Sequence, residues 1–313
     1  MRSVQKDANN RVSVGWLNGM VTYHPDELVE RAEQAYEQQI ASAAEQVFKK
    51  REENPVLLLS GPSASSKTTT AGKIASALIA RGVDTAVISL DDFFKNRTEL
   101  PLLPNGETDF ESIDTLDLDR LNSCFDALLR YGEAGFPTFD FSLGKRSDTT
   151  RLVKAGHGTI LIVEGIHALN PQITKDCARD GFQRLYISPN SDYEEDGRLI
   201  LTAREIRLIR RLVRDHYYRG SSIENTMQMW SGVVRSEIVS IIPYRSEADI
   251  IVDSMILYEP AVWARYLSSI LKTENVSLRF AAKIGKLRRS LTRFVPLPDK
   301  YIPEKTVLHE FLG

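Results

Sequence analysis

Short apolar runs separated by longer mixed segments are the dominant pattern along the chain. Each run holds five or six mostly apolar residues, without the alternation of apolar and polar side chains that marks a half-exposed strand. Continuous runs of this kind are typical of strands buried on both faces of a sheet. The runs cover residues 56–60, 85–90, 159–163, 184–188 and 249–253. Because helix-like segments separate them, we predict a five-stranded parallel sheet with crossover helices.

Helical spacing of apolar residues occurs before, between and after these runs. Residues 26–52 predict a polar amphipathic helix. Another helix is expected over 67–81, because Gly82 follows it and glycine favours the left-handed conformation that ends many helices. Beyond residue 254, the pattern predicts helices at about 258–272 and 276–292.

Two stretches interrupt this alternation. Residues 96–150 are rich in Pro, Gly and Asp and contain one convincing helix, near 117–131. A span of that length inside a compact domain is more often a functional insertion than a linker. The other stretch, 198–219, predicts an arginine-rich helix. We expect both to carry function.

Composition narrows the class of protein. The 313 residues are 42% hydrophobic and 26% charged, so the chain can bury a core and is not of the disordered type. A net charge of −2 gives no overall attraction to nucleic acid or membranes. Cys124 and Cys177 are too few for a disulfide framework. No apolar stretch approaches the length of a membrane span or a signal peptide, so we expect a cytoplasmic protein.

The stretch GPSASSKTTT resembles a phosphate-binding loop, G-x-x-x-x-G-K-[ST], with one departure. In such a loop the backbone N–H groups and the following helix N-terminus hold phosphates, and the lysine reaches the β and γ phosphates. A hydroxyl next to the lysine can bind Mg²⁺. The alternative is an ordinary turn rich in Ser and Gly. The predicted nucleotide-binding residues are Gly61, Ser63, Ala64, Ser65, Ser66, Lys67, Thr68 and Thr69.

The departure is Ser66, which stands where the second glycine of the pattern belongs. Glycine there allows a positive φ or a close approach of the backbone to a phosphate. Serine is small, but a non-glycine residue at positive φ is uncommon. We expect Ser66 to change affinity or geometry without abolishing binding.

Carboxylates follow two of the other predicted strands. Asp91 and Asp92 come after the second run, and Glu164 comes after the third. Ligands of open α/β sheets collect beyond the carboxyl ends of the strands, where these groups would join the phosphate loop. That combination is typical of Mg²⁺-dependent phosphoryl transfer. Taken alone, each carboxylate could equally serve a turn, a helix cap or solvent. His167, without partner histidines, is expected to be structural.

The arginine-rich helix places four guanidinium groups along one face. Like charges three or four residues apart destabilise a helix, so the stripe should face an anion or nearby carboxylates. Such arginines can close as a lid over a phosphoryl group. The alternative is a solvated helix whose arginines pair with Glu205, Asp196 or another segment. The stripe consists of Arg204, Arg207, Arg211 and Arg214.

Together, these stretches resemble the uridine kinase and phosphoribulokinase branch of P-loop kinases, and most of all bacterial uridine kinase-like proteins. The resemblance covers about residues 55–255 and includes the C-terminal IPEKTVLHEFLG. The stretches that carry it are GPSASSKTTTA, SLDDFFKN, DFESIDTLDL, PTFDFSLGKR, IVEGIHALN and RLIRRLVRDHYYRG. It implies a three-layer α/β P-loop kinase fold that uses ATP and Mg²⁺.

The expected organisation has three parts. A helical N-terminal extension covers 1–53, a P-loop kinase core covers 54–255, and a helical C-terminal appendage covers 256–313. Within the core, residues 96–150 form an acceptor-binding insertion and residues 198–220 form an arginine lid.

The resemblance also implies roles for single residues. Lys67 would hold the β and γ phosphates, and Asp91 would be the general base for the acceptor hydroxyl. The Mg²⁺ residues would be Thr68, Glu164 and Asp91, and the lid residues would be Arg211, Arg214 and Arg219. The acceptor would be bound by Asp92, Phe110, Asp117, Phe139, Arg146 and Arg219.

Three positions depart from the pyrimidine-nucleoside kinases. Gly144 stands where those kinases carry a base-recognising histidine, Phe139 replaces a tyrosine, and Ser221 replaces a lid arginine. The phosphoryl-transfer residues are intact, whereas the acceptor is left open.

We predict a kinase for a small-molecule hydroxyl, with the 5′-hydroxyl of a nucleoside as first candidate. The alternatives are another acceptor, such as a phosphorylated sugar or a pantothenate-like alcohol, and a nucleotide-binding regulator without turnover. An RNA-binding role for the arginine helix is disfavoured, because no basic and aromatic stacking platform is evident. Neither nucleic acid nor a membrane is expected as a partner, and homo-oligomer formation stays open.

Overall fold

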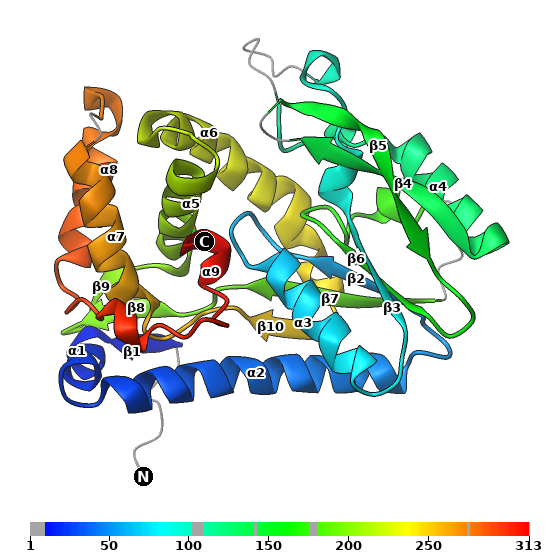
Figure 1. Cartoon of the computed structure of the whole chain (residues 1–313). Coiled ribbons are helices and arrows are strands. Elements are labelled where there is room, and N and C mark those ends of the chain that lie inside the picture. The colour runs from blue at the N-terminus through cyan, green and yellow to red at the C-terminus, as the bar shows by residue number, and fades with distance from the viewer. Residues whose placement is uncertain (1–9, 102–108, 141–142, 176–180, 274–275, 313) are drawn as a thin grey trace.

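A five-stranded parallel sheet lies at the centre of the molecule (Figure 1). The structure, a computed structural model, describes residues 10–101, 109–140, 143–175, 181–273 and 276–312. Cys177 and parts of the predicted insertion lie outside these ranges. In sheet order, the strands are β10 (Ile250–Asp253), β7 (Phe182–Ser188), β2 (Val56–Ser60), β6 (Ile160–Glu164) and β3 (Thr85–Ser89). These are the five predicted strands, so the predicted sheet is confirmed.

The register of the central strands brings their carboxyl ends level. Leu59 of β2 lies opposite Glu164 of β6, and Glu164 lies opposite Ser89 of β3. The phosphate loop after β2, Glu164 and the acidic pair after β3 therefore meet at one rim of the sheet, as expected for ligand sites of α/β proteins.

Helices α2 (Pro25–Lys49) and α3 (Lys67–Ile79) cover one face of the sheet. Helix α2 starts with proline, which has no N–H to leave unpaired. Asp26 and Glu27 lie in its first turn, where their negative charges interact favourably with the helix dipole. After α3, Gly82 takes a φ of 79°, the left-handed conformation predicted at that position.

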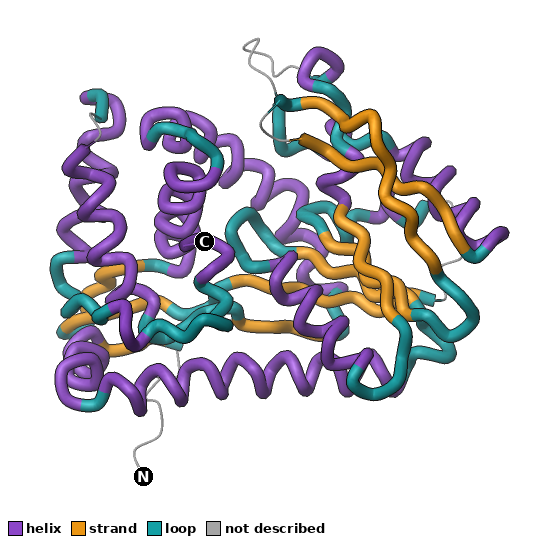
Figure 2. The backbone as a smooth tube through the Cα atoms, viewed as in Figure 1, coloured by secondary structure: helices purple, strands orange, loops and turns teal. Residues whose placement is uncertain are grey.

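The other face is covered by α4 (Leu118–Tyr131) and the antiparallel hairpin of β4 (Glu133–Asp140) and β5 (Lys145–Lys154). A separate apolar cluster joins this layer to the sheet and includes Leu58, Val163, Phe93, Phe136 and Leu121. Three layers result, as predicted (Figure 2). The hairpin was not predicted, because most side chains of β5 are exposed and polar and show no apolar pattern.

The arginine-rich helix begins later than predicted. Residues 198–201 form strand β9 (Arg198–Leu201), which pairs antiparallel with β8 (Asp192–Glu195). Asp196 and Gly197 connect them with φ values of 51° and 74°, the positive angles of a tight hairpin turn. Helix α5 then covers Ala203–Tyr218, and its N-terminus is closed by a capping box of Thr202 and Glu205. The predicted start of the helix was therefore wrong.

A small second sheet joins the N-terminal segment to this hairpin. Strand β1 (Arg11–Ser13) pairs in parallel with β8, and α1 (Val14–Tyr23) follows it. The segment expected to be a helical extension thus also contains a strand.

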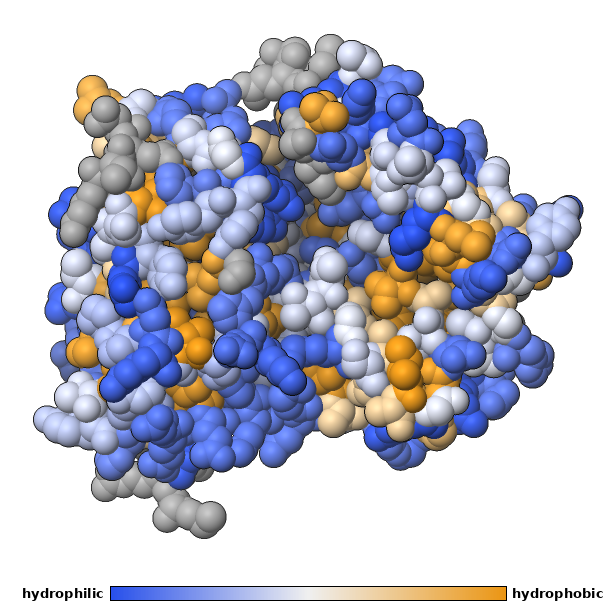
Figure 3. All heavy atoms as spheres, in the orientation of Figure 1, coloured by the Kyte–Doolittle hydropathy of each residue, from blue (hydrophilic) through white to orange (hydrophobic). Residues whose placement is uncertain are grey.

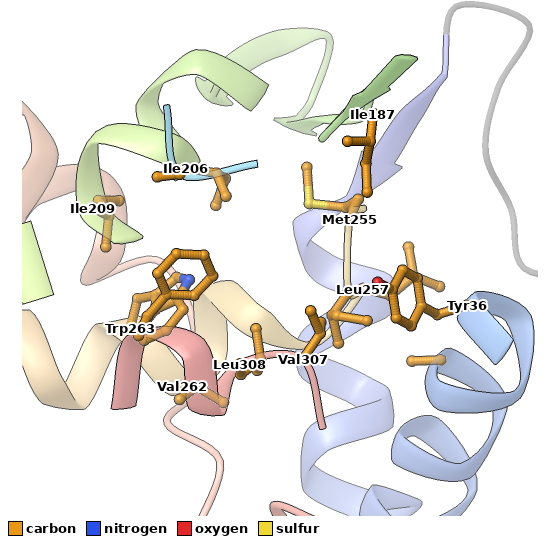
Figure 4. Close-up of a cluster of buried hydrophobic side chains, with 14 of the residues drawn as sticks. Tyr36, Ile187, Ile206, Ile209, Met255, Leu257, Val262, Trp263, Val307 and Leu308 are labelled. Atoms are coloured by element: carbon orange, nitrogen blue, oxygen red, sulfur yellow. The ribbon is translucent and has the colours of Figure 1, made fainter. Parts of the chain in front are cut away.

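The remaining helices are α6 (Ile223–Ser236), α7 (Glu259–Thr273), α8 (Leu278–Leu291) and α9 (His309–Leu312). They pack on α5 or, in the case of α8, mainly on α7 and β9. Figure 4 shows how Trp263 of α7 and Leu308 lie with Ile209 of α5 in one cluster, which extends to Tyr36 of α2 and Ile187 of β7. Both terminal segments therefore share a hydrophobic core with the sheet. In the described ranges, no helix is long and apolar enough to span a membrane.

Candidate active site

The loop between β2 and α3 has the backbone of a phosphate-binding loop. A Cβ on Gly61 would lie 2.1 Å from the carbonyl oxygen of Ile187, so only glycine fits there. Ala64 and Ser66 take φ values of 60° and 66°. For an L-residue this left-handed conformation costs about 1–2 kcal/mol, so the fold around the loop must hold it in place. Ser66 therefore adopts the conformation that glycine would supply.

Arg210 holds the loop from beneath. Its Nη1 donates to the carbonyl oxygen of Ala64 at 3.3 Å and lies 3.4 Å from Ser66 Oγ. Its Nε and Nη2 donate to the two carboxylate oxygens of Glu259 at 2.8 and 2.7 Å. Both side chains of this ion pair are fully buried, and the bidentate geometry leaves neither charge unpaired.

The sequence did not single out Arg210, because Arg210 is not part of the arginine stripe. It lies four residues after Ile206 and three before Val213, on the apolar face of α5. An arginine on an apolar face must find a buried acid, and that rule was the available signal.

Lys67 lies at the start of α3 and is half-buried against the loop. Its Nζ donates to the carbonyl oxygen of Pro62 at 3.2 Å. Burial lowers the pKa of its ammonium group, while the carboxylates of Glu164, Asp91 and Glu310 raise it. The lysine charge is thus held among acidic groups.

Thr68 and Glu164 lie side by side at the rim. Glu164 Oε1 accepts hydrogen bonds from Thr68 Oγ1 at 3.1 Å and from Ser89 Oγ at 2.7 Å. Its side chain is buried, and burial, followed by the charge of Asp91, raises the pKa of Glu164 to about 7. A cation at this carboxylate would relieve both effects.

The acidic pair after β3 is split between two directions. Asp91 and Asp92 lie in a single 3₁₀ turn. Ser89 caps this turn, because its Oγ accepts a hydrogen bond from the N–H of Asp91 at 3.3 Å. The charge of Asp91 acts on the pKa values of Lys67 and Glu164, so it belongs to the rim. Asp92 lies 3.9 Å from Nη2 of Arg151 on β5 and so turns to the hairpin.

The second half of the arginine stripe faces the phosphate loop. Arg211 Nη1 donates to Ser63 Oγ of the loop at 3.0 Å, and its Nε lies 3.3 Å from Asp215. Arg214 pairs with the same carboxylate at 2.9 Å. Arg219 lies 3.9 Å from Asp215, and burial followed by the charge of Arg214 lowers the pKa of Arg219 to about 10. Asp215 therefore gathers the three predicted lid residues.

The first half of the stripe has a different partner. Arg204 and Arg207 both pair with Glu237, which follows α6. Arg207 and Arg211 are buried, so these two arginines are not solvated as in the alternative, whereas Arg204 is 47% exposed. The pairing with another segment, which the alternative also allowed, is present at Glu237. Glu205, expected in that alternative as an arginine partner, pairs with Lys286 of α8.

Glu111 is a further acidic group beside the loop that the sequence did not single out. Its carboxylate lies 3.7 Å from Arg211, and burial raises the pKa of Glu111 while the arginine lowers it. Its carbonyl oxygen is 3.0 Å from Nε2 of His167, which gives the histidine a structural contact.

Of the predicted acceptor residues, Asp117, Phe139 and Arg146 lie at the hairpin or in contact with it. Asp117 caps α4 and pairs with Arg146 of β5 at 2.6 Å. Arg146 Nε also donates to the carbonyl oxygen of Phe94 at 3.1 Å, and the Phe94 ring packs edge-on against Phe139 at 5.7 Å. Phe110 is 39% exposed.

Gly144 has a steric reason. Its φ is 63°, and a Cβ there would lie 2.3 Å from Nε of Arg97. A histidine at this position would therefore require both a strained backbone and displacement of Arg97.

The surface is hollowed between the part built by α5 and α6 and the part built by the hairpin (Figure 3).

Comparison with known proteins agrees with this geometry. The sequence model of the phosphoribulokinase / uridine kinase family matches residues 56–178 and 198–258, more than half of the chain. The chain belongs to this family. It is a P-loop kinase, a phosphotransferase that acts on a hydroxyl group of a small molecule.

Two relatives illustrate how far the similarity extends. Uridine kinase of Bacillus pumilus is 29% identical over 200 residues, which cover 63% of this chain and 86% of the relative. Uridine kinase of Saccharomyces cerevisiae is 25% identical over 263 residues, or 82% of this chain and 46% of the relative. Among solved structures, a putative fructose transport system kinase from Silicibacter superposes with a TM-score of 0.50 at 20% identity, covering 68% of this chain and 98% of that one. That superposition supports the fold.

Proposed function

We propose that this protein transfers the γ-phosphoryl group of ATP to a nucleoside, at its 5′-hydroxyl. The observation that carries the proposal is the meeting, at one rim, of the phosphate loop, the Thr68–Glu164 pair and Asp91. Members of the family named uridine kinase support the choice of a nucleoside.

The loop fits a nucleotide polyphosphate. Left-handed residues at positions 64 and 66 curl the backbone, Lys67 Nζ contacts the carbonyl oxygen of Pro62 in the loop, and Ser65 Oγ is buried without a hydrogen-bond partner among the described residues. A phosphate would give that hydroxyl an acceptor. The N-terminus of α3 adds a favourable partial charge.

The rim also fits Mg²⁺, because the hydroxyl of Thr68 and the carboxylate of Glu164 are the hard oxygen ligands that this ion prefers. When bound there, Mg²⁺ would neutralise charge on the transferring phosphoryl group.

In this proposal Asp91 receives the proton of the acceptor hydroxyl. It sits at the end of β3 and acts electrostatically on Lys67, Glu164 and Arg219, so it lies between the loop and the lid. Arg211 and Arg214 stabilise the charge of the phosphoryl group from the lid side. Asp215 keeps both guanidinium groups oriented.

The acceptor would lie against the hairpin, near Asp117, Phe139 and Arg146, with Asp92, Phe110 and Arg219 at its border. A second candidate acceptor is another small alcohol. Gly144 favours it, because the positive φ at this position strains any other residue, a base-reading histidine included.

The test is ADP release from Mg-ATP with a panel of nucleosides, sugars and sugar phosphates. Asp91→Asn should reduce turnover by about 10²–10⁴-fold, the range of general-base contributions, and should leave ATP binding intact. Lys67→Ala should mainly weaken the use of ATP. Asp126→Asn, on the exposed face of α4, is the matched control and should keep full activity. Full activity of Asp91→Asn would remove that residue from the mechanism.

A further inference from the structure

A carboxylate from the far end of the chain lies at the first turn of the phosphate-binding helix. Glu310 Oε2 accepts a hydrogen bond from Thr69 Oγ1 at 2.6 Å, across 241 residues of sequence. Thr69 is the third residue of α3, which begins at Lys67. The first turn of a helix has free N–H groups and a partial positive charge, which attract anions. This turn is the helix N-terminus that a phosphate-binding loop offers to a bound phosphate.

The charge of Glu310 reaches the loop itself. Burial is the main influence on the pKa of Lys67 and lowers it, but Glu310 acts in the opposite direction together with Glu164 and Asp91. Arg210, beneath the loop, is also within its electrostatic range. Glu164 and Asp91 have proposed roles in phosphoryl transfer, whereas Glu310 has none.

The backbone that carries Glu310 is firmly anchored. Val307, Leu308 and Phe311 are fully buried on both sides of it. The ring of Phe311 packs edge-on against Trp263 at 6.3 Å and lies 5.1 Å from the guanidinium of Arg210. Figure 4 shows Val307 and Leu308 in the same cluster as Trp263.

Polar contacts add to this anchoring. Thr306 Oγ1 donates to Glu33 of α2 at 2.7 Å, and the hydroxyl of Tyr258 donates to the same carboxylate at 2.6 Å. The tail therefore cannot leave the loop as a flap, because Phe311 would have to leave the core. The backbone of helix α9 is therefore held in place beside the loop, whereas the side chain of Glu310 can rotate.

We propose that Glu310 lowers the affinity of the nucleotide site for nucleoside polyphosphates by placing a like charge beside the phosphates bound at the first turn of α3. The inference rests on the proposed binding of ATP in this loop. An incoming nucleotide must either accept this repulsion or take Thr69 Oγ1 away from Glu310. Both effects weaken binding, and neither touches the reacting atoms.

The test is titration calorimetry of Mg-ADP against the whole protein. Glu310→Gln keeps the size of the side chain and its ability to accept from Thr69 but removes the charge. Like charges a few ångströms apart at a partly exposed site differ from a neutral pair by about tenfold in affinity. Glu310→Gln should therefore bind ADP about tenfold more tightly, and the gain should shrink at high ionic strength.

Glu304→Gln is the matched control. Glu304 belongs to the same tail and is exposed, so this variant makes the same change in net charge and should bind ADP as the wild type does. Thermal unfolding without nucleotide should be the same in all three proteins.

The outcomes separate the two claims. If the wild type binds ADP and Glu310→Gln binds it equally or more weakly, the role of Glu310 is overturned while the nucleotide site stands. If neither protein binds ADP or ATP, the proposed function itself falls, and the role of Glu310 falls with it.

Discussion

Ser66 and Arg210 show how a side chain unusual for its motif is accommodated. Ser66 keeps the left-handed backbone at a φ of 66°, and Arg210 contacts both its hydroxyl and the carbonyl oxygen of Ala64. Arg210 can be buried beside the loop because its charge is paired with the carboxylate of Glu259. The departure from glycine thus changes what supports the loop and leaves its conformation as it is.

Glu164 makes the stability of the folded protein depend on pH. Burial raises the pKa of Glu164 from 4.5 to about 7, so the folded protein holds a proton that the unfolded chain releases between these values. The associated stability is fully present below 4.5 and is lost as the pH rises through about 7. The loss should be on the order of 3 kcal/mol.

Urea unfolding of the wild type and Glu164→Gln checks this expectation, because the variant lacks the titrating group. Relative to the variant, the wild type should be less stable above pH 7 than near pH 4.5. Mg-ATP should reverse part of the loss, since a cation favours the carboxylate. A difference between the two proteins that does not vary with pH would contradict the assignment.

At the scale of elements, α5 divides its arginines between two tasks. Arg211 touches the phosphate loop at Ser63, whereas Arg204, 47% exposed, faces Glu237 on the other side. Arg211→Gln should therefore lower kcat on the order of 10²–10³-fold, as loss of a group that stabilises transition-state charge does. Arg204→Gln, two turns earlier on the same helix, should change kcat less than twofold because it faces no loop residue.

Steady-state kinetics with saturating ATP measure this difference. Thermal unfolding of both variants checks that they fold. Equal losses of kcat in the two variants would show that the stripe acts through the stability of the helix and not through a lid.

Elements differed in how well the sequence predicted them. The five sheet strands were predictable because each is a continuous apolar run, buried on both faces. Strand β5 was not, since nearly all its side chains are exposed. The start of α5 was predicted too early, at residue 198, although Asp196–Gly197 is a strong turn signal and Arg198–Leu201 forms β9.

The candidate site was predictable where its residues lie at or just beyond a strand end, as Glu164 and Asp91 do, or within the phosphate-loop motif, as Lys67 does. Arg210 and Glu310 were not, because their contacts with the loop span 144 and 241 residues and depend on how α5 and the tail pack. Local pattern carries no information on such contacts.

At the scale of the whole molecule, the two ends of the chain complete the core of the kinase. Phe311 is fully buried between Trp263 and Arg210, one residue before the last described position. Phe311→Ala should destabilise the protein by about 3–5 kcal/mol, the usual loss for a buried aromatic ring. It should also weaken ADP binding, because Arg210 loses its neighbour beneath the loop.

Leu278→Ala is the matched control, because Leu278 is 95% exposed at the start of α8. Its stability should stay within about 0.5 kcal/mol of the wild type. Urea unfolding followed by circular dichroism measures both variants. Equal stability of the two would show that the tail is an independent appendage and not part of the core.

Transfer of labelled γ-phosphate from Mg-ATP tests the central claim most directly, because it follows the phosphoryl group and not only ADP. With wild-type protein and a suitable nucleoside, the label should appear on the nucleoside in a one-to-one ratio with ADP, and Asp91→Asn should slow the transfer by about 10²–10⁴-fold. Label that appears only as inorganic phosphate, or on no acceptor at all, would contradict the assignment of this rim as a site of phosphoryl transfer to a hydroxyl.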